Sequence, residues 1–546
     1  MDFSRAKRAM LFFFLILSLT GLACNAVTAS PEPSPFPTWT PVPPTALPLE
    51  TPLPTPAGAP ATLPPGSNPQ ALAACPLDEQ SRSMRSGITP DWKKTEINAC
   101  YDLSIGLNAD GSAYTGSEKL SFTNAMGVPL TELVFRTYPN ASVIYGGKLT
   151  VSAAKVDGQT VEHEVFLRDQ TGLRLKLVSP LEPGASTVIE MQYGGQLPTD
   201  FNSGNGYGIF ERSTLKNGAG FVVTLANFYP ILAQWTNGRW VATEVIGGGD
   251  AVVSSVSLYQ VHVQAPAGWK VAATGSQIGT RNESGGAWLD YAGGPVREFI
   301  LVASPALEAR QVQSGDITIT HWGLPGTEKN WDEALKIAKN SVALYTQRYG
   351  EYPYKELDVV SVPLRYASGV EYPGLVLIET GQYGNSGQPG LELATVISHE
   401  IAHQWWYGVV GSDVLEHPFQ DEALATYSEL VYEQKYNPVV YRGELAIYRA
   451  DVKSVEDHQG KKLVDQSVAA FNGDDNAYAA IVYLKGALFY QALRDQLGDD
   501  AFFQALQIYY QNNAFTTADV NALFDSFEQG CRCDPSPIFE EYGVEQ

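Results

Sequence analysis

The alternation of hydrophobic and polar residues divides the chain into a strand-rich part and a helix-rich part. From about residue 91 to residue 306, apolar residues come in short alternating or β-branched runs, at 118–123, 149–156, 186–193, 254–264 and 297–303. Turn signals such as Asp157-Gly158 separate these runs. No repeat of fixed period is present, which argues against a solenoid or a propeller. The pattern therefore predicts an N-terminal all-β domain.

The pattern changes after about residue 315. A strand-like run at 317–322 leads into a segment with helical spacing of apolar residues at 330–349. Two more strand-like runs follow at 357–362 and 375–378, and from residue 391 onward, including 391–407, the spacing is helical. The last 230 residues or so are therefore predicted to form an α+β domain, so that the chain as a whole is a multidomain α+β protein.

The N-terminal residues carry export signals instead of a fold pattern. Arg5, Lys7 and Arg8 precede an apolar run at 10–19 and then a small-residue stretch that ends at Cys24. This is typical of a signal peptide, here residues 1–24, and the run is too short to span a bilayer comfortably. The position of Cys24 resembles a bacterial lipoprotein cleavage site, which implies a lipid anchor on Cys24 and an extracytoplasmic, membrane-tethered protein. Ordinary secretion after cleavage and an uncleaved anchor remain the alternatives.

A proline-rich segment follows the signal. Residues 31–66 contain 14 prolines among Thr, Ala and Leu, a composition that favours extended polyproline II coil and cannot pack a core. We expect residues 25–88 to be a disordered tether, residues 89–308 to form the β domain, and residues 309–546 to form the α+β domain. A proline-rich ligand for a partner module is the competing interpretation of the tether.

The charge balance narrows the class of partner. The 546 residues include 36 Lys and Arg against 59 Asp and Glu, a formal net charge of -23, with 44% hydrophobic residues to build cores. Such a charge repels phosphate backbones, so nucleic acid is not an expected partner. The oligomeric state is not predicted by any feature of the chain.

Four cysteines besides Cys24 raise the question of disulfides, and four thiols allow three connectivities. In an exported protein they can oxidise. We expect Cys75 to pair with Cys100, because a bridge between Cys531 and Cys533, one residue apart, is expected to be strained. A two-cysteine metal site at those last two positions is the alternative, although no histidine lies near them in the sequence.

One short motif carries metal chemistry. His399-Glu400-Ile401-Ala402-His403 lies in a predicted helix, where a spacing of four places both imidazoles on one face. The alternative without a metal is that the two histidines are buried structural residues whose hydrogen bonds go to backbone carbonyls. Catalytic zinc takes three protein ligands, and Glu422 follows His403 after 18 intervening residues, at the start of a second predicted helix.

This HExxH, 18 residues, Glu pattern resembles the gluzincin zinc aminopeptidases, the family of membrane alanyl aminopeptidase and leukotriene hydrolase. Two further family signatures have counterparts here. The segment Gly369-Val370-Glu371 is similar to Gly-x-Met-Glu-Asn, and Tyr483 lies in a Tyr-x-Lys-Gly segment 61 residues beyond Glu422. Val370 stands where the family has Met, Tyr372 stands where it has Asn, and the third segment reads Asp-Glu-Ala instead of Asn-Glu-Gly.

The resemblance implies a fold and a site. The fold is a saddle-like β domain followed by a thermolysin-like catalytic domain, with the large C-terminal helical domain of many members absent. The cofactor is one Zn²⁺ per chain, held by His399, His403 and Glu422. Glu400 is the general base for a metal-activated water, Tyr483 stabilises the oxyanion, and the 369–371 strand binds substrate, with the Glu371 carboxylate on the free amine.

The implied activity is removal of the N-terminal residue from peptides with a free N-terminus. Another zinc hydrolase on the same scaffold, an endopeptidase or an epoxide hydrolase, is the first alternative, and a metal-free binding module is the second. The family also takes a second amine contact from its β domain, for which the segment 224–230 offers no obvious Gln or Glu. The other histidines are expected to be structural, as are Trp405 and Trp406, and the first-position side-chain preference is not predicted.

Overall fold

The computed structural model describes residues 80–88, 90, 95, 97–199, 206–249, 251–283, 286–384 and 391–545. The predicted signal peptide, Cys24, Cys75 and most of the predicted tether lie outside these residues. Within the described part, no helix is long and apolar enough to cross a membrane. The end of the predicted tether differs from expectation, because Arg85 is part of the fold and pairs with Asp316 and Glu351 at 2.7 Å each.

The β domain is built on one large sheet and two smaller ones. The large sheet has the order β16-β17-β14-β1-β2-β8-β4-β5. Its strands are β1 (Ala99–Leu107), β2 (Ala113–Thr123), β4 (Lys148–Val156), β5 (Gln159–Thr160), β8 (Ser186–Gln196), β14 (Ser257–Pro266), β16 (Ser276–Glu283) and β17 (Gly286–Val296). Strands β1 and β14 pair in parallel, and the other neighbours are antiparallel. Buried and exposed residues alternate along β8 and β14, which places one face of the sheet on the core.

The smaller sheets complete this domain. One has the order β15-β18-β10-β9 and the other β11-β3-β7-β6. Their strands are β3 (Leu130–Arg136), β6 (His163–Phe166), β7 (Gly172–Leu181), β9 (Phe210–Thr214), β10 (Phe221–Leu225), β11 (Ile231–Leu232), β15 (Lys270–Ala273) and β18 (Leu301–Ser304). A short hairpin joins β12 (Trp235–Thr236) to β13 (Arg239–Trp240). The run expected as a strand at 297–303 is a strand only from Leu301. Residues 297–300 connect the end of β17 to the start of β18.

A mixed five-stranded sheet begins the α+β part, with the order β19-β20-β21-β23-β22. Its strands are β19 (Glu308–Ser314), β20 (Ile317–Gly323), β21 (Glu356–Val362), β22 (Gly369–Tyr372) and β23 (Leu375–Glu379). The central strands β20, β21 and β23 are parallel, and the outer strands β19 and β22 pair antiparallel. This sheet confirms the strands predicted at 317–322, 357–362 and 375–378.

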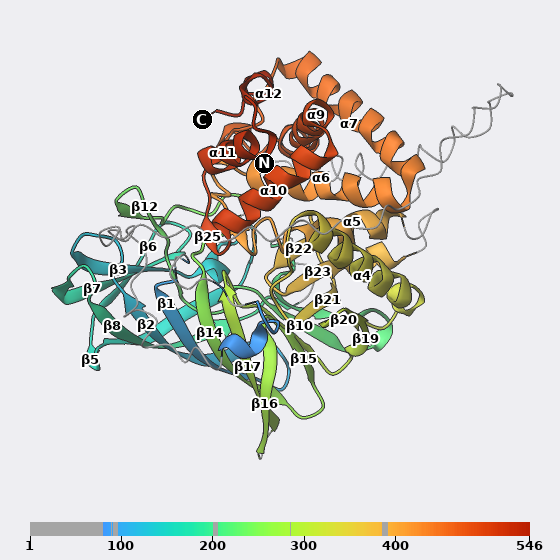
Figure 1. Ribbon diagram of the computed structural model, residues 1–546. Coiled ribbons are helices and arrows are strands. Elements are labelled where there is room, and N and C mark those ends of the chain that lie inside the picture. The colour runs from blue at the N-terminus through green and yellow to red at the C-terminus, as the bar shows by residue number, and fades with distance from the viewer. Residues whose placement is uncertain are drawn as a thin grey trace, which may run out of the picture. The chain divides into compact units, whose positions relative to one another are not determined.

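Helices cover this sheet and continue to the end of the chain. They are α4 (Trp331–Arg348), α5 (Leu391–Ala402), α6 (Phe419–Tyr436), α7 (Pro438–Gln459), α8 (Asp475–Tyr478), a π-helical segment η9 (Ala479–Lys485), α9 (Gly486–Leu497), α10 (Asp499–Asn513), α11 (Val520–Cys531) and α12 (Ser536–Tyr542). Helix α4 packs on β19 and β20, while the orange to red helices from α6 onward gather together (Figure 1). The buried residues Leu335, Ala338, Val342 and Tyr345 of α4 recur every three or four positions, as an amphipathic helix requires.

Short 3-10 turns connect these elements. They are η2 (Ser81–Ser83), η3 (Tyr138–Asn140), η5 (Lys216–Gly218), η6 (Glu328–Asn330), η7 (Thr380–Tyr383) and η8 (Val468–Phe471). Two short strands, β24 (Val410–Gly411) and β25 (Thr516–Thr517), pair in parallel and join the loop after α5 to the segment after α10. The loop after α5 is thereby fixed to the C-terminal helices.

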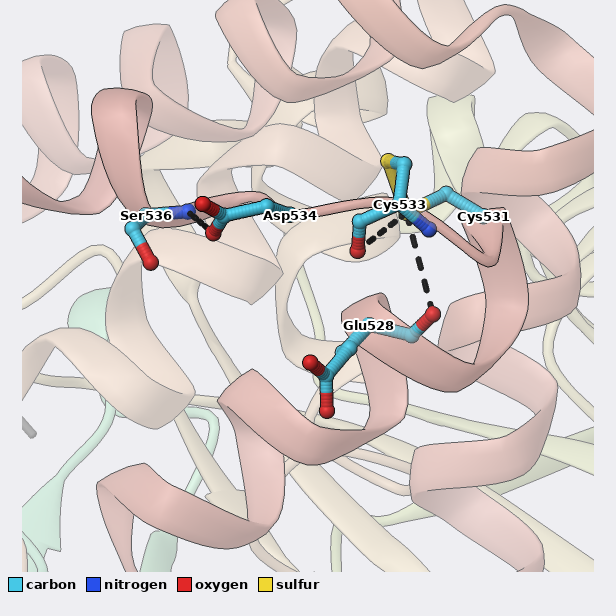
Figure 2. The surroundings of a disulfide bond; sticks show 5 residues. All are labelled: Glu528, Cys531, Cys533, Asp534 and Ser536. Atoms are coloured by element: carbon cyan, nitrogen blue, oxygen red, sulfur yellow. Dashed lines mark hydrogen bonds between the residues drawn. A yellow bond between two sulfur atoms is a disulfide. The ribbon is translucent and has the colours of Figure 1, made fainter.

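The cysteine pairing corrects one expectation. Cys531 and Cys533 form a disulfide between α11 and α12, with Cα atoms 5.2 Å apart (Figure 2). A bridge across one intervening residue, which the sequence analysis counted against, therefore does form, and its Cα separation is within the ordinary range for a disulfide. Arg532 between them has a positive φ of 54°, which turns the chain back on itself. Cys100 is disulfide-bonded, and its pairing with Cys75 stays a prediction.

Candidate active site

The two histidines of the motif lie at the end of α5. The helix ends at Ala402, earlier than the 391–407 expected, because the chain turns sharply there: Trp405 N donates to Ala402 O and Gly408 N to His403 O. The turn does not separate the imidazoles. The Nε2 atoms of His399 and His403 are 3.1 Å apart and face one another.

Helix α6 brings Glu422 to the same point. Its Oε2 lies 3.3 Å from the Nε2 of His399 and 3.4 Å from the Nε2 of His403. The three ligand atoms all lie within 4.8 Å of one another, and they form the metal-ligating group found among the described residues. Glu422 Oε2 is buried and accepts no hydrogen bond that would satisfy it. A buried carboxylate oxygen facing two imidazole nitrogens fits a tetrahedral zinc site with one further position.

Each imidazole is oriented from behind. His399 Nδ1 lies 2.5 Å from Glu429 Oε1, and His403 Nδ1 lies 3.0 Å from the carbonyl oxygen of Trp406. A carbonyl or an ionised carboxylate only accepts, so both Nδ1 atoms carry the hydrogen and both Nε2 lone pairs are left for a metal. Such outer partners fix the tautomer and the ring plane of metal-binding histidines.

Glu400 lies beside this point and is 5% exposed. Burial raises the pKa of its carboxyl to about 8, and the negative charge of Glu371 adds to the shift against the opposing effect of His399. A Cβ built on Gly369 would collide with the Glu400 carboxylate, so glycine is needed where β22 passes over it.

Strand β22 carries Gly369, Val370 and Glu371 at the edge of the five-stranded sheet, paired only with β23. Gln404 fixes this strand to the end of α5: its Nε2 donates to Tyr372 O at 3.0 Å and its Oε1 accepts from Gly374 N at 2.7 Å. An exposed sheet edge of this kind can accept an extended peptide by β-augmentation. Sequence reasoning passed over Gln404, although it directly follows His403.

The charge of the site calls for a cation. Burial raises the pKa of Glu371, with Glu422 adding to the effect and His403 opposing it. Burial also acts on Glu422, but the two imidazoles of His399 and His403 that face it outweigh burial and lower the pKa of that carboxyl. Against the effect of burial, Glu371 and Glu422 raise the pKa of His403 to about 10. Without a metal, the imidazoles would have to carry the positive charge that these buried carboxylates require.

Tyr483 approaches from η9. Its hydroxyl donates to Glu422 Oε1, and its ring stacks on His399 with centroids 6.0 Å apart and planes 11° from parallel. The π-helical segment that carries it is a local widening of the helix, a feature that recurs at functional sites. Of the eight residues expected in the site, seven lie on α5, β22, α6 and η9, and His403 lies in the turn directly after α5.

The β domain contributes a carboxylate that the sequence analysis missed. Glu298 is 2% exposed and accepts from Asn227 Nδ2 at 2.6 Å and from the Tyr407 hydroxyl. Burial raises the pKa of Glu298 to about 7, and the charge of Glu371 contributes. Asn227 belongs to the segment 224–230, where no Gln or Glu was found. The signal that could have identified Glu298 is the charged pair Arg297-Glu298 inside an apolar run.

Other residues considered beforehand lie outside the metal point. His417 Nδ1 pairs with Asp465 at 2.7 Å, which raises the pKa of His417. Trp405 and Trp406 are each 1% exposed and contact Tyr345 and Tyr349, respectively, so they pack the end of α5 against α4.

Comparison with known proteins agrees with this geometry. Residues 333–542 match the Peptidase family M1 domain. Aminopeptidase N of Lactobacillus helveticus is 27% identical over 224 residues, 39% of this chain and 26% of that protein. Aminopeptidase M1 of Arabidopsis thaliana is 26% identical over 211 residues, 36% of this chain and 23% of that protein. The chain thus spans about a quarter of the length of the curated relatives it matches.

A solved structure shares the fold over most of both chains. The M1 zinc metallopeptidase from Deinococcus radiodurans has a TM-score of 0.58 and 22% sequence identity, covering 84% of this chain and 95% of that chain. A mutant of an M1 zinc metallopeptidase from the same organism was crystallised with a Tyr-Ser-Ala substrate, with a TM-score of 0.57 and 20% identity over 82% of this chain and 95% of that one. These likenesses show the fold, a β domain followed by an α+β domain.

Proposed function

We propose that the chain, whose residues 333–542 match the Peptidase family M1 domain, is a zinc-dependent aminopeptidase that removes the N-terminal residue from peptides. The observation that carries the proposal is the meeting of His399, His403 and Glu422 at one point beside Glu400 and Glu371. A site with two imidazoles and one carboxylate is typical of catalytic zinc.

When bound, zinc supplies Lewis-acid polarisation of the scissile carbonyl and activates water at neutral pH. The protein residues do the rest. Glu400, whose pKa is raised to about 8, is suited to take a proton from water and return it to the leaving amine. The Tyr483 hydroxyl, which donates to Glu422 Oε1 in the free site, would turn its hydrogen toward the oxygen on which negative charge develops.

Exopeptidase action would come from the acidic end of the cleft. Glu371, with Glu298 close enough to influence it, presents negative charge where a substrate ammonium would lie. An ammonium fixed at one distance from the metal places only the first peptide bond over Glu400. The edge of β22 would hold the backbone of the same substrate by hydrogen bonds.

The test compares one aminoacyl arylamide with a free amine and its N-acetylated twin on the purified protein. We expect turnover of the free amine to be far faster. Equal turnover would favour an endopeptidase or another zinc hydrolase on the same scaffold. As a matched variant, Glu371→Ala should strongly lower turnover of the free amine while zinc content stays at one per chain. Unchanged turnover in that variant would show that the amine anchor is misassigned.

We also propose that the protein is exported and tethered to a bacterial membrane by lipid on Cys24. The support is the sequence alone: basic residues, an apolar run, small residues and then Cys24. In cells that make the full chain, the protein should enter the detergent phase of a detergent partition. Cys24→Ser should shift it to the aqueous phase, and an unchanged partition would refute the lipid anchor.

A further inference from the structure

A strained turn directly follows the metal-binding helix. Tyr407 has a φ of 124°, a conformation that L side chains rarely adopt and that glycine adopts freely. Strain of this kind costs on the order of 1–3 kcal/mol and persists only where the surroundings impose it. The same turn holds the carbonyl of Trp406, the oxygen that His403 Nδ1 contacts at 3.0 Å. The conformation of the turn therefore bears on the orientation of a metal ligand.

Arg297 of the β domain holds this turn from below. It is 2% exposed and donates to three carbonyl oxygens: Tyr407 O at 2.7 Å, Ser254 O at 3.1 Å and Thr516 O at 2.6 Å. Three acceptors from three distant segments match the rigid fork of a guanidinium and not a single ammonium. A Cβ built on Gly411 would collide with the guanidinium, so the loop after α5 closes tightly over it.

Glu298, the next residue, holds the same turn by its side chain. Its carboxylate accepts from the Tyr407 hydroxyl and, through the other oxygen, from Asn227 Nδ2. Asn227 Oδ1 in turn accepts from the Tyr145 hydroxyl at 2.6 Å, which connects the turn to the core of the β domain. Two adjacent β-domain residues thus grip the backbone and the ring of one strained residue.

We propose that Arg297 and Glu298 are positioning residues for the metal ligand His403, acting through Tyr407 and the turn at 404–408. The β domain then takes part in setting zinc affinity, in addition to lining the cleft. Losing the grip releases the strained φ, moves the Trp406 carbonyl and leaves His403 free to rotate away from the metal point. This inference rests on the proposed zinc-dependent function and deepens it.

The experiment measures the zinc dissociation constant of the full chain by competition with a chelating dye. Arg297→Ala should weaken zinc binding by about 10- to 100-fold, the usual effect of losing an outer partner of a metal ligand. Arg297→Lys should recover part of this loss, since one ammonium cannot reach all three carbonyls. Tyr407→Phe, which removes one hydroxyl, should weaken binding by about tenfold or less. The cobalt-substituted variants should show an altered visible spectrum.

Arg365 offers a matched control. Its side chain is 9% exposed, pairs with Glu211 of β9 and donates to Gly206 O at 2.8 Å, so it joins the same two parts of the molecule through residues outside the turn. Arg365→Ala should lower the melting temperature while the zinc dissociation constant and the cobalt spectrum stay unchanged. A loss of affinity in Arg365→Ala equal to that in Arg297→Ala would overturn the inference, because any weakened domain contact would then suffice.

The remaining outcomes are decisive too. Parent-like zinc affinity in folded Arg297→Ala overturns the proposal, and if that variant does not fold, parent-like affinity in both Tyr407→Phe and Glu298→Gln does so. The unmodified chain separates this inference from the function. Zinc binding without cleavage of free-amine substrates refutes the proposed function. The zinc dissociation constants of the variants then still test whether Arg297 and Glu298 position His403. Cleavage together with a zinc affinity that does not depend on Arg297 refutes only the positioning role of Arg297 and Glu298.

Discussion

The two halves of helix α6 put the same side chain in opposite electrostatic situations. Glu422 in the first turn and Glu433 three turns later are both buried, at 5% and 0% exposed. Against the effect of burial, the two imidazoles that face Glu422 lower its pKa. Burial raises the pKa of Glu433 to about 7, and among the described residues no basic side chain forms an ion pair with it.

Glu429 lies between these two and shows the transition. It accepts from His399 at 2.5 Å, which lowers its pKa, yet burial raises it by more. Beyond it, Glu444 of α7 has a pKa raised to about 8 by burial, with Glu429 and Glu433 as negative neighbours. The difference teaches that burial alone does not create a metal ligand: a buried carboxylate keeps its charge only where cationic or metal-binding partners face it.

The largest effect is expected when Glu422, in the first turn of α6, is neutralised. Glu422→Gln removes the charge and weakens one of three metal ligands, so the protein should lose zinc on dialysis. Turnover should fall by more than the roughly 100-fold typical of an outer-shell change. Zinc per chain by elemental analysis checks this, with Glu433→Gln as the isosteric control on the same helix. A full complement of zinc in Glu422→Gln would contradict the ligand assignment.

A second change leaves the metal ligands intact and removes only a hydrogen. Tyr483→Phe should keep zinc at one per chain but lower kcat by about 10²–10³-fold, the usual cost of losing one oxyanion donor. KM should change little, because the donor acts on charge that develops during the reaction. Steady-state kinetics on the free-amine arylamide measure both constants. A higher KM with an unchanged kcat would place Tyr483 in substrate binding instead.

The parts of this arrangement that sequence could predict are those that lie close together in the chain. The spacing of His399 and His403 needs only a helix, and the three parallel strands β20, β21 and β23 needed only their apolar runs. The metal fit of Glu422 came from a resemblance, since nothing local says which of 59 acidic residues faces α5. The segment 369–372 reads as a turn without that resemblance, and it is strand β22 because β23 pairs with it.

What sequence could not supply are contacts between distant segments. Gln404 holds β22, Glu298 accepts from the Tyr407 hydroxyl, and Arg297 donates to the turn after α5, yet no periodicity links these residues. The end of α5 at Ala402 was also missed, because the sharp turn that stops the helix is imposed by packing and by β24 pairing with β25. Tertiary contacts override the helical pattern there.

The middle of α6 gives a sharper test of the boundary between its two halves. Glu429→Ala should weaken zinc binding by about 10- to 100-fold while leaving the three ligands in place. Glu429→Gln retains an acceptor for His399 Nδ1 and should lose less. Competition with a chelating dye gives both dissociation constants. Equal affinity in Glu429→Ala and the parent would place the boundary before Glu429, so that only the first turn of α6 serves the metal.

The smallest effect concerns Glu433, near the C-terminal end of α6, and appears in the pH dependence of the free energy of unfolding. The pKa of Glu433 is raised in the fold from its ordinary 4.5 to about 7. A carboxyl with a raised folded pKa stabilises the fold below its unfolded pKa, and this contribution is lost as pH rises through the folded pKa. Between pH 4.5 and 7 the loss amounts to up to about 3 kcal/mol in the free energy of unfolding.

Glu433→Gln has no charge to bury, so its stability relative to the parent should rise over that pH range. Urea unfolding at pH 5, 6, 7 and 8 measures the difference, and the exposed Glu528→Gln is the control that should show none. The parent also contains Glu444, which shifts in the same direction, so the variant removes one part of the pH dependence and not all of it. A difference in unfolding free energy that does not change with pH would mean that Glu433 keeps its charge in the fold. The contrast between Glu422 and Glu433 at the two ends of α6 would then be refuted.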